Sequence, residues 1–174
     1  LVAIDSVEGE PAPGAPFGAE VRKMYDMALA DCEAEGFVTR GFEGYALDAT
    51  LPGESEEAIA VLGHLDVVPA GDGWPMDPFA AVREGDKIYG RGTQDTKGSL
   101  YGELAALEQL LERGFQPKCN VWIGSSCNEE TSGNGIPAAR DWFVEQGITF
   151  DVILDEGGAV IDPPISGMAA EKCA

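Results

Sequence analysis

Strand-like apolar runs alternate along this chain with segments that have the period of a helix. The strand-like runs occupy residues 45–51, 58–62, 88–89, 119–124 and 152–154. The helical patterns occupy residues 21–32, 96–113 and 137–146. Strands that alternate with helices are typical of α/β proteins, because each helix connects two neighbouring strands and covers one face of their sheet. We therefore expect an α/β fold with a mainly parallel sheet flanked by helices.

Composition limits the class of partner. The chain has 31 acidic against 11 basic side chains, a net charge of −20, which disfavours nucleic acid and anionic membrane surfaces. No apolar run approaches the roughly 18 residues that a membrane span needs. The four cysteines form no C-x-x-C pair, which argues against a disulfide framework or a zinc ribbon; they are Cys32, Cys119, Cys127 and Cys173. We expect a globular cytoplasmic protein without nucleic-acid or membrane partners.

Histidine and carboxylate side chains follow the strand-like runs. In chain order they are His64 and Asp66, Asp95, Glu129 and Glu130, and Asp155 and Glu156. The carboxyl ends of parallel strands meet at one edge of a sheet, so these groups should lie together. Massed carboxylates repel one another unless a cation lies between them. An imidazole with several carboxylates and no thiolate is typical of a zinc, cobalt or manganese site for hydrolysis.

Four ordered motifs carry a family resemblance. They are Gly63-His64-Leu65-Asp66-Val67-Val68-Pro69; Trp74 with Asp77-Pro78-Phe79; Gly90-Arg91-Gly92-Thr93-Gln94-Asp95-Thr96-Lys97-Gly98; and Asn128-Glu129-Glu130-Thr131-Ser132-Gly133. Together they resemble the di-zinc exopeptidase family, which includes glutamate carboxypeptidase, bacterial dipeptidases, vacuolar-type carboxypeptidase, aminoacylase and acetylornithine deacylase. Members of that family have a catalytic domain split by an inserted smaller domain. The resemblance implies that residues 1–174 are the N-terminal segment of the catalytic domain, with the inserted lid or dimerisation domain and the C-terminal catalytic segment absent; the chain begins with Leu1 rather than Met.

The resemblance also assigns roles around the histidine. His64 resembles the first metal ligand and Asp95 the carboxylate that bridges two metals. Asp66 resembles the acid that orients His64. Alternate residues of an extended segment face the same side, so His64 and Asp66 are able to meet, and a carboxylate on the free ring nitrogen fixes the tautomer.

The remaining acidic residues receive roles in the same way. Glu129 resembles the general base and Glu130 the metal ligand beside it. The third acidic ligand falls in the turn Asp155-Glu156-Gly157-Gly158, where we choose Asp155 because it follows the strand directly and keep Glu156 as the alternative. Two positions depart from the family pattern, since Thr96 and Asn128 stand where many members have aspartate.

The function implied by the resemblance is zinc-dependent hydrolysis of an amide bond in dipeptides or short peptides by a metal-activated water. A deacylase for N-acyl amino acids, or a non-catalytic relative that serves as an interaction domain, is the alternative. The resemblance implies two zinc ions, or cobalt or manganese, and a full-length homodimer. His64 is the only histidine, so this chain should hold at most one metal ion and be inactive alone.

Two nucleotide-binding alternatives fit less well. Residues 133–138 match the dinucleotide fingerprint G-x-G-x-x-A, but eight residues separate Gly133 from the preceding strand-like run. Two of those residues, Glu129 and Glu130, would repel a pyrophosphate. Residues 92–99 lack the Gly-Lys-Ser/Thr order of a P-loop.

Overall fold

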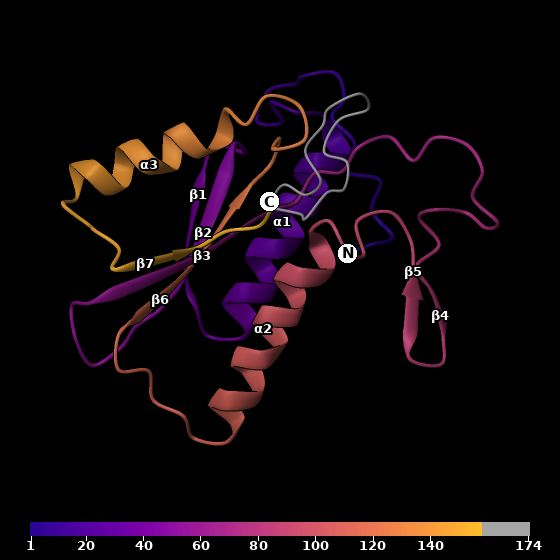
Figure 1. Cartoon of the computed structure of the whole chain (residues 1–174). Coiled ribbons are helices and arrows are strands. Elements are labelled where there is room, and N and C mark those ends of the chain that lie inside the picture. Colours follow the sequence, from indigo (N-terminus) through magenta and orange to yellow (C-terminus); the bar gives the residue numbers. More distant parts are fainter. Residues whose placement is uncertain (158–174) are drawn as a thin grey trace, which may run out of the picture.

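A five-stranded sheet forms the centre of residues 1–157, the part of the chain that this computed structural model describes (Figure 1). In chain order the elements are α1 (Ala19–Ala34), β1 (Val38–Phe42), β2 (Ala46–Leu51), β3 (Ala58–His64), β4 (Val82–Glu84), β5 (Lys87–Tyr89), α2 (Lys97–Glu112), β6 (Asn120–Ser126), α3 (Gly135–Glu145) and β7 (Val152–Leu154). The three helices and the strands 46–51, 58–64, 120–126 and 152–154 confirm the predicted elements to within a few residues. No helix among the described residues is both long and apolar enough to cross a bilayer.

The sheet is mixed rather than mainly parallel. Its strand order is β1-β2-β6-β3-β7, and β3 runs parallel to both β6 and β7. β1 and β2 run antiparallel because a tight hairpin joins them, in which Glu43 and Gly44 take φ values of 51° and 85°. The predicted α/β fold with flanking helices is confirmed. The antiparallel pairs of the sheet, β1 with β2 and β2 with β6, both involve this hairpin, and its first strand has no strong strand pattern in the sequence.

Helices cover both faces of the sheet (Figure 1). On one face α1 and α2 contribute Met24, Tyr25 and Leu100 to the main apolar core, where they pack with Leu47 and Ile123 of the sheet. On the other face lies α3, which contacts β2 and β6. The alternation of side chains along a strand explains this division, because successive residues of β2 point to opposite faces.

A separate hairpin precedes α2. β5 confirms the short strand predicted around Ile88 and Tyr89, but it pairs only with β4, away from the main sheet (Figure 1). The expectation that Asp95 follows a strand of the main sheet is therefore wrong. The loop 90–96 instead places Asp95 just before the start of α2, and α2 packs against β3.

Candidate metal centre

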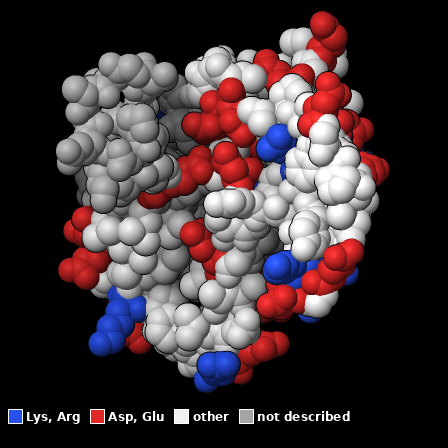
Figure 2. All heavy atoms as spheres, turned by 45° about the vertical axis from the view of Figure 1, so that its right-hand side comes forward, with Lys and Arg blue, Asp and Glu red and all other residues white. Residues whose placement is uncertain are grey.

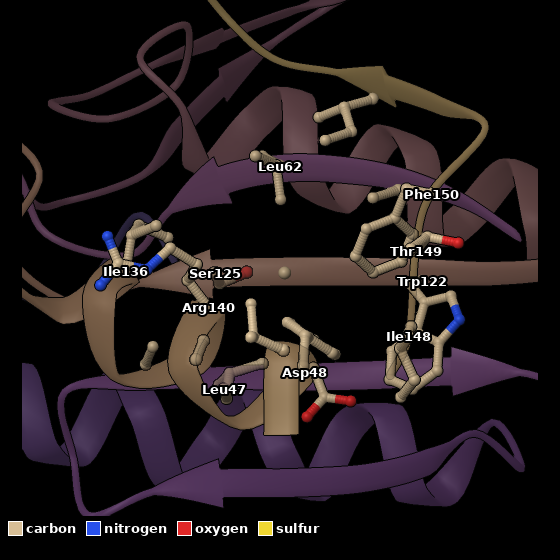
Figure 3. A pocket seen from close by; sticks show the side chains of 17 residues that line it. Leu47, Asp48, Leu62, Trp122, Ser125, Ile136, Arg140, Ile148, Thr149 and Phe150 are labelled. Carbon is tan, nitrogen blue, oxygen red and sulfur yellow. The ribbon is translucent and has the colours of Figure 1, made fainter. Parts of the chain in front are cut away.

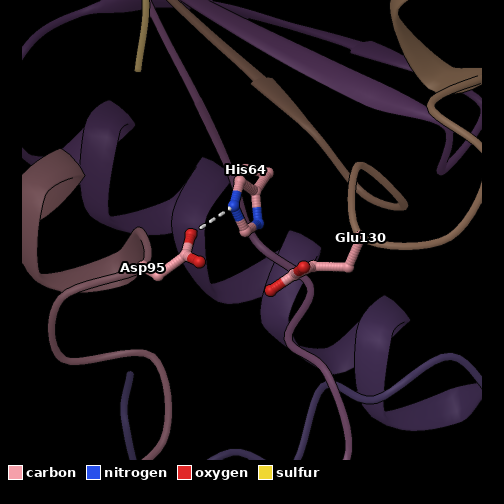
Figure 4. Close-up of side chains that lie close together, drawn as sticks. All are labelled: His64, Asp95 and Glu130. Carbon is pink, nitrogen blue, oxygen red and sulfur yellow. Dashed lines mark hydrogen bonds and ion pairs between the residues drawn. The ribbon is translucent and has the colours of Figure 1, made fainter. Parts of the chain in front are cut away.

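The predicted site residues gather where β3 and β6 end. These strands are paired in parallel so that His64, the last residue of β3, lies opposite Ser126, the last residue of β6. The turn after β6 brings Glu129 and Glu130 to the same edge. The start of α2 brings Asp95 there, and Figure 4 shows it facing the imidazole ring of His64 with Glu130 nearby.

His64 is buried, and carboxylates surround its Nε2 atom. That atom lies 2.9 Å from Asp95 Oδ1, 3.1 Å from Glu156 Oε1 and 3.9 Å from Glu129 Oε2. Two sets of three residues have the spacing of metal ligands, because within each set one donor atom per residue lies within 4.8 Å of the others. The first set is His64, Asp95 and Glu130, and the second is His64, Glu129 and Glu156. At this edge of the sheet, which we call the rim, the two sets together include five of the seven groups that follow the strand-like runs.

The other ring nitrogen of His64 faces Asp66, as the sequence spacing predicts. The Nδ1 atom lies 3.0 Å from the Asp66 carbonyl oxygen and 3.4 Å from its carboxylate. Both oxygens are acceptors, which suits a proton on Nδ1, while Nε2 faces the carboxylates of Asp95 and Glu156. This is the orientation that a metal ligand on the rim requires.

Asp66 also holds the turn that carries the two glutamates. Its side chain is 1% exposed, and its two oxygens accept the backbone N–H groups of Glu129 and Glu130, each at 3.0 Å. One buried carboxylate therefore connects His64 with both glutamates. The sequence indicated the contact with His64, but no local pattern reveals a bond to a backbone 63 residues away.

Asp155 is the one predicted ligand that belongs to neither set. Its Oδ1 atom accepts the N–H of Glu156 at 2.9 Å, while the Glu156 carboxylate reaches His64. The alternative residue of the sequence analysis thus lies at the imidazole. Gly158, the last residue of that turn, lies outside the described part of the chain.

The charges at the rim favour a cation. Burial alone would lower the pKa of His64, but its contacts with Asp66, Asp95 and Glu156 raise that pKa to about 9. Burial is the main cause that raises the pKa values of Glu130 and Glu156; the negative charge of Asp95 also raises both, and His64 partly offsets these effects. One imidazolium cannot neutralise this many carboxylates. Acidic side chains also outnumber basic ones on the face shown in Figure 2.

The donor set fits a divalent metal ion. One imidazole nitrogen and several carboxylate oxygens converge, and neither set of potential ligands includes a thiolate. Such ligands are typical of zinc, cobalt and manganese. A cavity of about 380 Å³ opens beside them, lined by Asp95, Glu129 and Glu156 among others, and leaves room for a small substrate.

A second cavity lies between α3 and the sheet. It measures about 390 Å³ and has apolar walls; Figure 3 shows Leu62, Trp122 and Ile136 among the residues that line it. Leu62 and Ile136 line the rim cavity as well, so the two adjoin. Asp48 is the acidic residue that lines this cavity. Burial raises the pKa of Asp48 to about 6, although the positive charge of Arg40 nearby lowers it.

Three buried polar residues near the site have partners that the sequence did not indicate. Asn128 accepts the Gly135 N–H through Oδ1 and donates through Nδ2 to Ser132 and Asn134, which shapes the turn after Glu129 and Glu130. The Lys97 ammonium group donates to the Ile4 carbonyl. Thr96 binds the backbone of His64. The sequence drew attention to Thr96 and Asn128 as departures from the family pattern, and to Lys97 only as part of a motif, but it revealed none of these contacts.

Comparison with known proteins gives consistent matches. Residues 60–169 match the sequence profile described as peptidase family M20/M25/M40. The chain is 36% identical over 149 residues to N-fatty-acyl-amino acid synthase/hydrolase PM20D1.1 of Danio rerio, covering 84% of this chain and 28% of that protein. It is 34% identical over 157 residues to Beta-Ala-Xaa dipeptidase of Lactobacillus delbrueckii subsp. lactis, covering 88% of this chain and 32% of that protein.

A solved structure shares the fold. Human carnosine dipeptidase 1 superposes with a TM-score of 0.76 at 22% identity, covering 92% of this chain and 37% of that chain. The chain thus spans about a third of the length of the proteins it matches.

Proposed function

This chain belongs to peptidase family M20/M25/M40, and on that premise we propose that it is part of a metal-dependent hydrolase that cleaves an amide bond in dipeptides or short peptides. The observation that carries the proposal is a single buried histidine whose Nε2 atom faces carboxylates from three separate segments, Asp95, Glu129 and Glu156. A similar dipeptidase in Lactobacillus supports the substrate class.

We propose that His64, Asp95 and Glu130 are metal ligands, with zinc as the ion and cobalt or manganese as substitutes. Glu156 joins them in preference to Asp155, because its carboxylate lies 3.1 Å from the imidazole. When bound, the metal supplies a Lewis acid that lowers the pKa of water and polarises a carbonyl group. Two ions are proposed for the full-length protein and at most one for this chain, which has one histidine.

Glu129 is the proposed general base. Its side chain is 53% exposed and lines the rim cavity, while Asp66 fixes its backbone. The carboxylate is therefore held at the site by its main chain and is free to turn toward a substrate. In this role Glu129 takes a proton from the attacking water and passes it to the leaving amine.

A second candidate substrate is an N-acyl amino acid. The similar protein from Danio rerio is an N-fatty-acyl-amino acid synthase/hydrolase, and an apolar cavity adjoins the rim of this chain. A non-catalytic interaction domain is the third reading. We place the protein in the cytoplasm, with small-molecule substrates, no nucleic-acid or membrane partner, and a homodimer as its full-length assembly.

The test uses the protein extended to the full length of its relatives. Hydrolysis is measured on a panel of dipeptides and a panel of N-acyl amino acids, with zinc content determined on the same samples. Glu129→Gln should lower turnover by at least about 100-fold and leave zinc content unchanged, because the base is not a ligand. The matched control, Glu84→Gln on β4, should behave like the wild type. Full activity in Glu129→Gln would refute the role of Glu129, and inactivity of the wild type on both panels would favour the interaction domain.

A further inference from the structure

One buried hydroxyl group holds the backbone of the histidine. Thr96 is 3% exposed and stands between Asp95 and the first turn of α2. Its Oγ1 atom accepts the N–H of His64 at 3.0 Å and donates to the His64 carbonyl oxygen at 3.1 Å. A single side chain thus satisfies both backbone groups of a residue that lies 32 positions away.

The sheet leaves these two groups without a strand partner. The N–H of Leu65 donates to Ser126 on β6, so the N–H and C=O of His64 point toward the opposite neighbour, where β7 should lie. β7 is too short to reach them, since its pairing with β3 ends at Val61. Thr96 takes the place of the missing strand residues, which matters because unpaired buried backbone groups are costly.

The Thr96 hydroxyl group bonds to the backbone of His64 instead of capping α2. Thr96 occupies the N-cap position of α2, where threonine side chains ordinarily accept a backbone N–H from the first helical turn. Its side chain makes no such capping bond. The polar atom is directed to the histidine instead, which points to a purpose other than helix stability.

We propose that Thr96 is a positioning residue that sets the spacing between His64 and Asp95 for a bound metal ion. The bond joins the backbone of one proposed ligand to the neighbour of the other, and their side chains meet at 2.9 Å. This inference rests on the metal site of the proposed function. The hydroxyl group makes both bonds because it donates as well as accepts, whereas the carboxylate that the resemblance places here in many relatives has no proton to donate to the His64 carbonyl oxygen.

The test measures zinc affinity of the 174-residue chain by competition with a chromophoric chelator. Thr96→Val keeps the shape of the side chain and removes both bonds, and it should weaken zinc binding about 10-fold or more, as loss of groups that orient metal ligands does. Thr96→Ser keeps the hydroxyl group and should restore affinity to within about threefold of the wild type.

A matched control separates positioning from general stability. Thr50 is another buried threonine, on β2, whose hydroxyl group contacts Asp48. Thr50→Val should lower the urea midpoint and leave zinc affinity unchanged. Should Thr96→Val fail to fold by circular dichroism, Thr96→Ala is compared with Thr96→Ser in the same way.

The outcomes distinguish the two proposals. A wild-type chain that binds no zinc, or binds it as tightly after His64→Ala, overturns the proposed metal site itself. A wild-type chain that binds zinc through His64, together with a folded Thr96→Val chain of equal affinity, overturns only the role of Thr96. Weak binding by Thr96→Val with recovery in Thr96→Ser supports it.

Discussion

Replacing Asp66 by asparagine removes the charge that connects the histidine to the two glutamates. The aspartate accepts two backbone N–H groups at 3.0 Å, from Glu129 and Glu130, in a buried position. Hydrogen bonds to a charged group contribute about 1.5–3 kcal/mol each. Asparagine has the same shape but a single oxygen, so one N–H keeps a partner and the other faces an NH₂ group. We expect the free energy of unfolding to fall by about 3 kcal/mol.

Urea denaturation of the 174-residue chain, followed by circular dichroism, measures this loss. With a slope of about 2 kcal/mol per molar urea, the midpoint should fall by about 1.5 M. The control is Asp77→Asn, because the exposed Asp77 accepts only one backbone N–H, from Phe79, and its replacement should cost less than about 0.5 kcal/mol. An Asp66→Asn midpoint as close to the wild type as that of the control would refute the reasoning.

Two further predictions concern buried titratable groups. Burial raises the pKa of Asp48 to about 6, which is above the pKa of an aspartate in an unfolded chain. The charged Asp48 side chain therefore opposes folding above about pH 6, and this penalty disappears as the pH falls toward 4 and the side chain becomes protonated. Asp48→Asn should therefore raise the free energy of unfolding by about 2–3 kcal/mol at pH 7.5 and by little at pH 4, as measured by urea denaturation at both pH values. An equal increase in the free energy of unfolding at both pH values would contradict the prediction. Burial also raises the pKa of Cys127 to about 12 and that of Cys32 to about 11. A thiol reagent should therefore modify the part-exposed Cys119 before these two cysteines, and mass spectrometry measures the order. Equally fast labelling of Cys127 would argue against its burial.

The elements with strong periodicity could be predicted from the sequence. α1 and α2 place their repeated apolar residues, such as Met24 and Leu100, in the core, and β3 and β6 are apolar strands of the central sheet. β1 has no such signal, because its edge position leaves Val38 exposed and its sequence contains Arg40 and Gly41. Its pairing comes from the hairpin with β2, and this pairing made half of the sheet antiparallel.

The site could be predicted as a set of residue types but not as a set of contacts. Spacing along an extended segment was enough to bring His64 to Asp66, because that contact is local. Asp95 reaches His64 through a loop and a helix start, which periodicity does not describe. Asp155 and Glu156 are adjacent in sequence, and only the direction of the turn after β7 decides which carboxylate faces the imidazole ring.

The predicted order of cysteine labelling concerns Cys32, Cys119 and Cys127, because Cys173 lies outside the residues that the structure describes.

X-ray absorption at the zinc edge of the 174-residue chain tests the central claim most directly. After loading and removal of free metal, the account predicts that the chain retains one zinc ion, the most that its single histidine allows, with a shell of nitrogen and oxygen at about 2.0–2.2 Å that contains a single imidazole. The same chain should show no amide hydrolysis above background, and His64→Ala should lose the ion. A chain that retains no zinc, a shell with sulfur at about 2.3 Å, or an unchanged spectrum in His64→Ala would contradict the account.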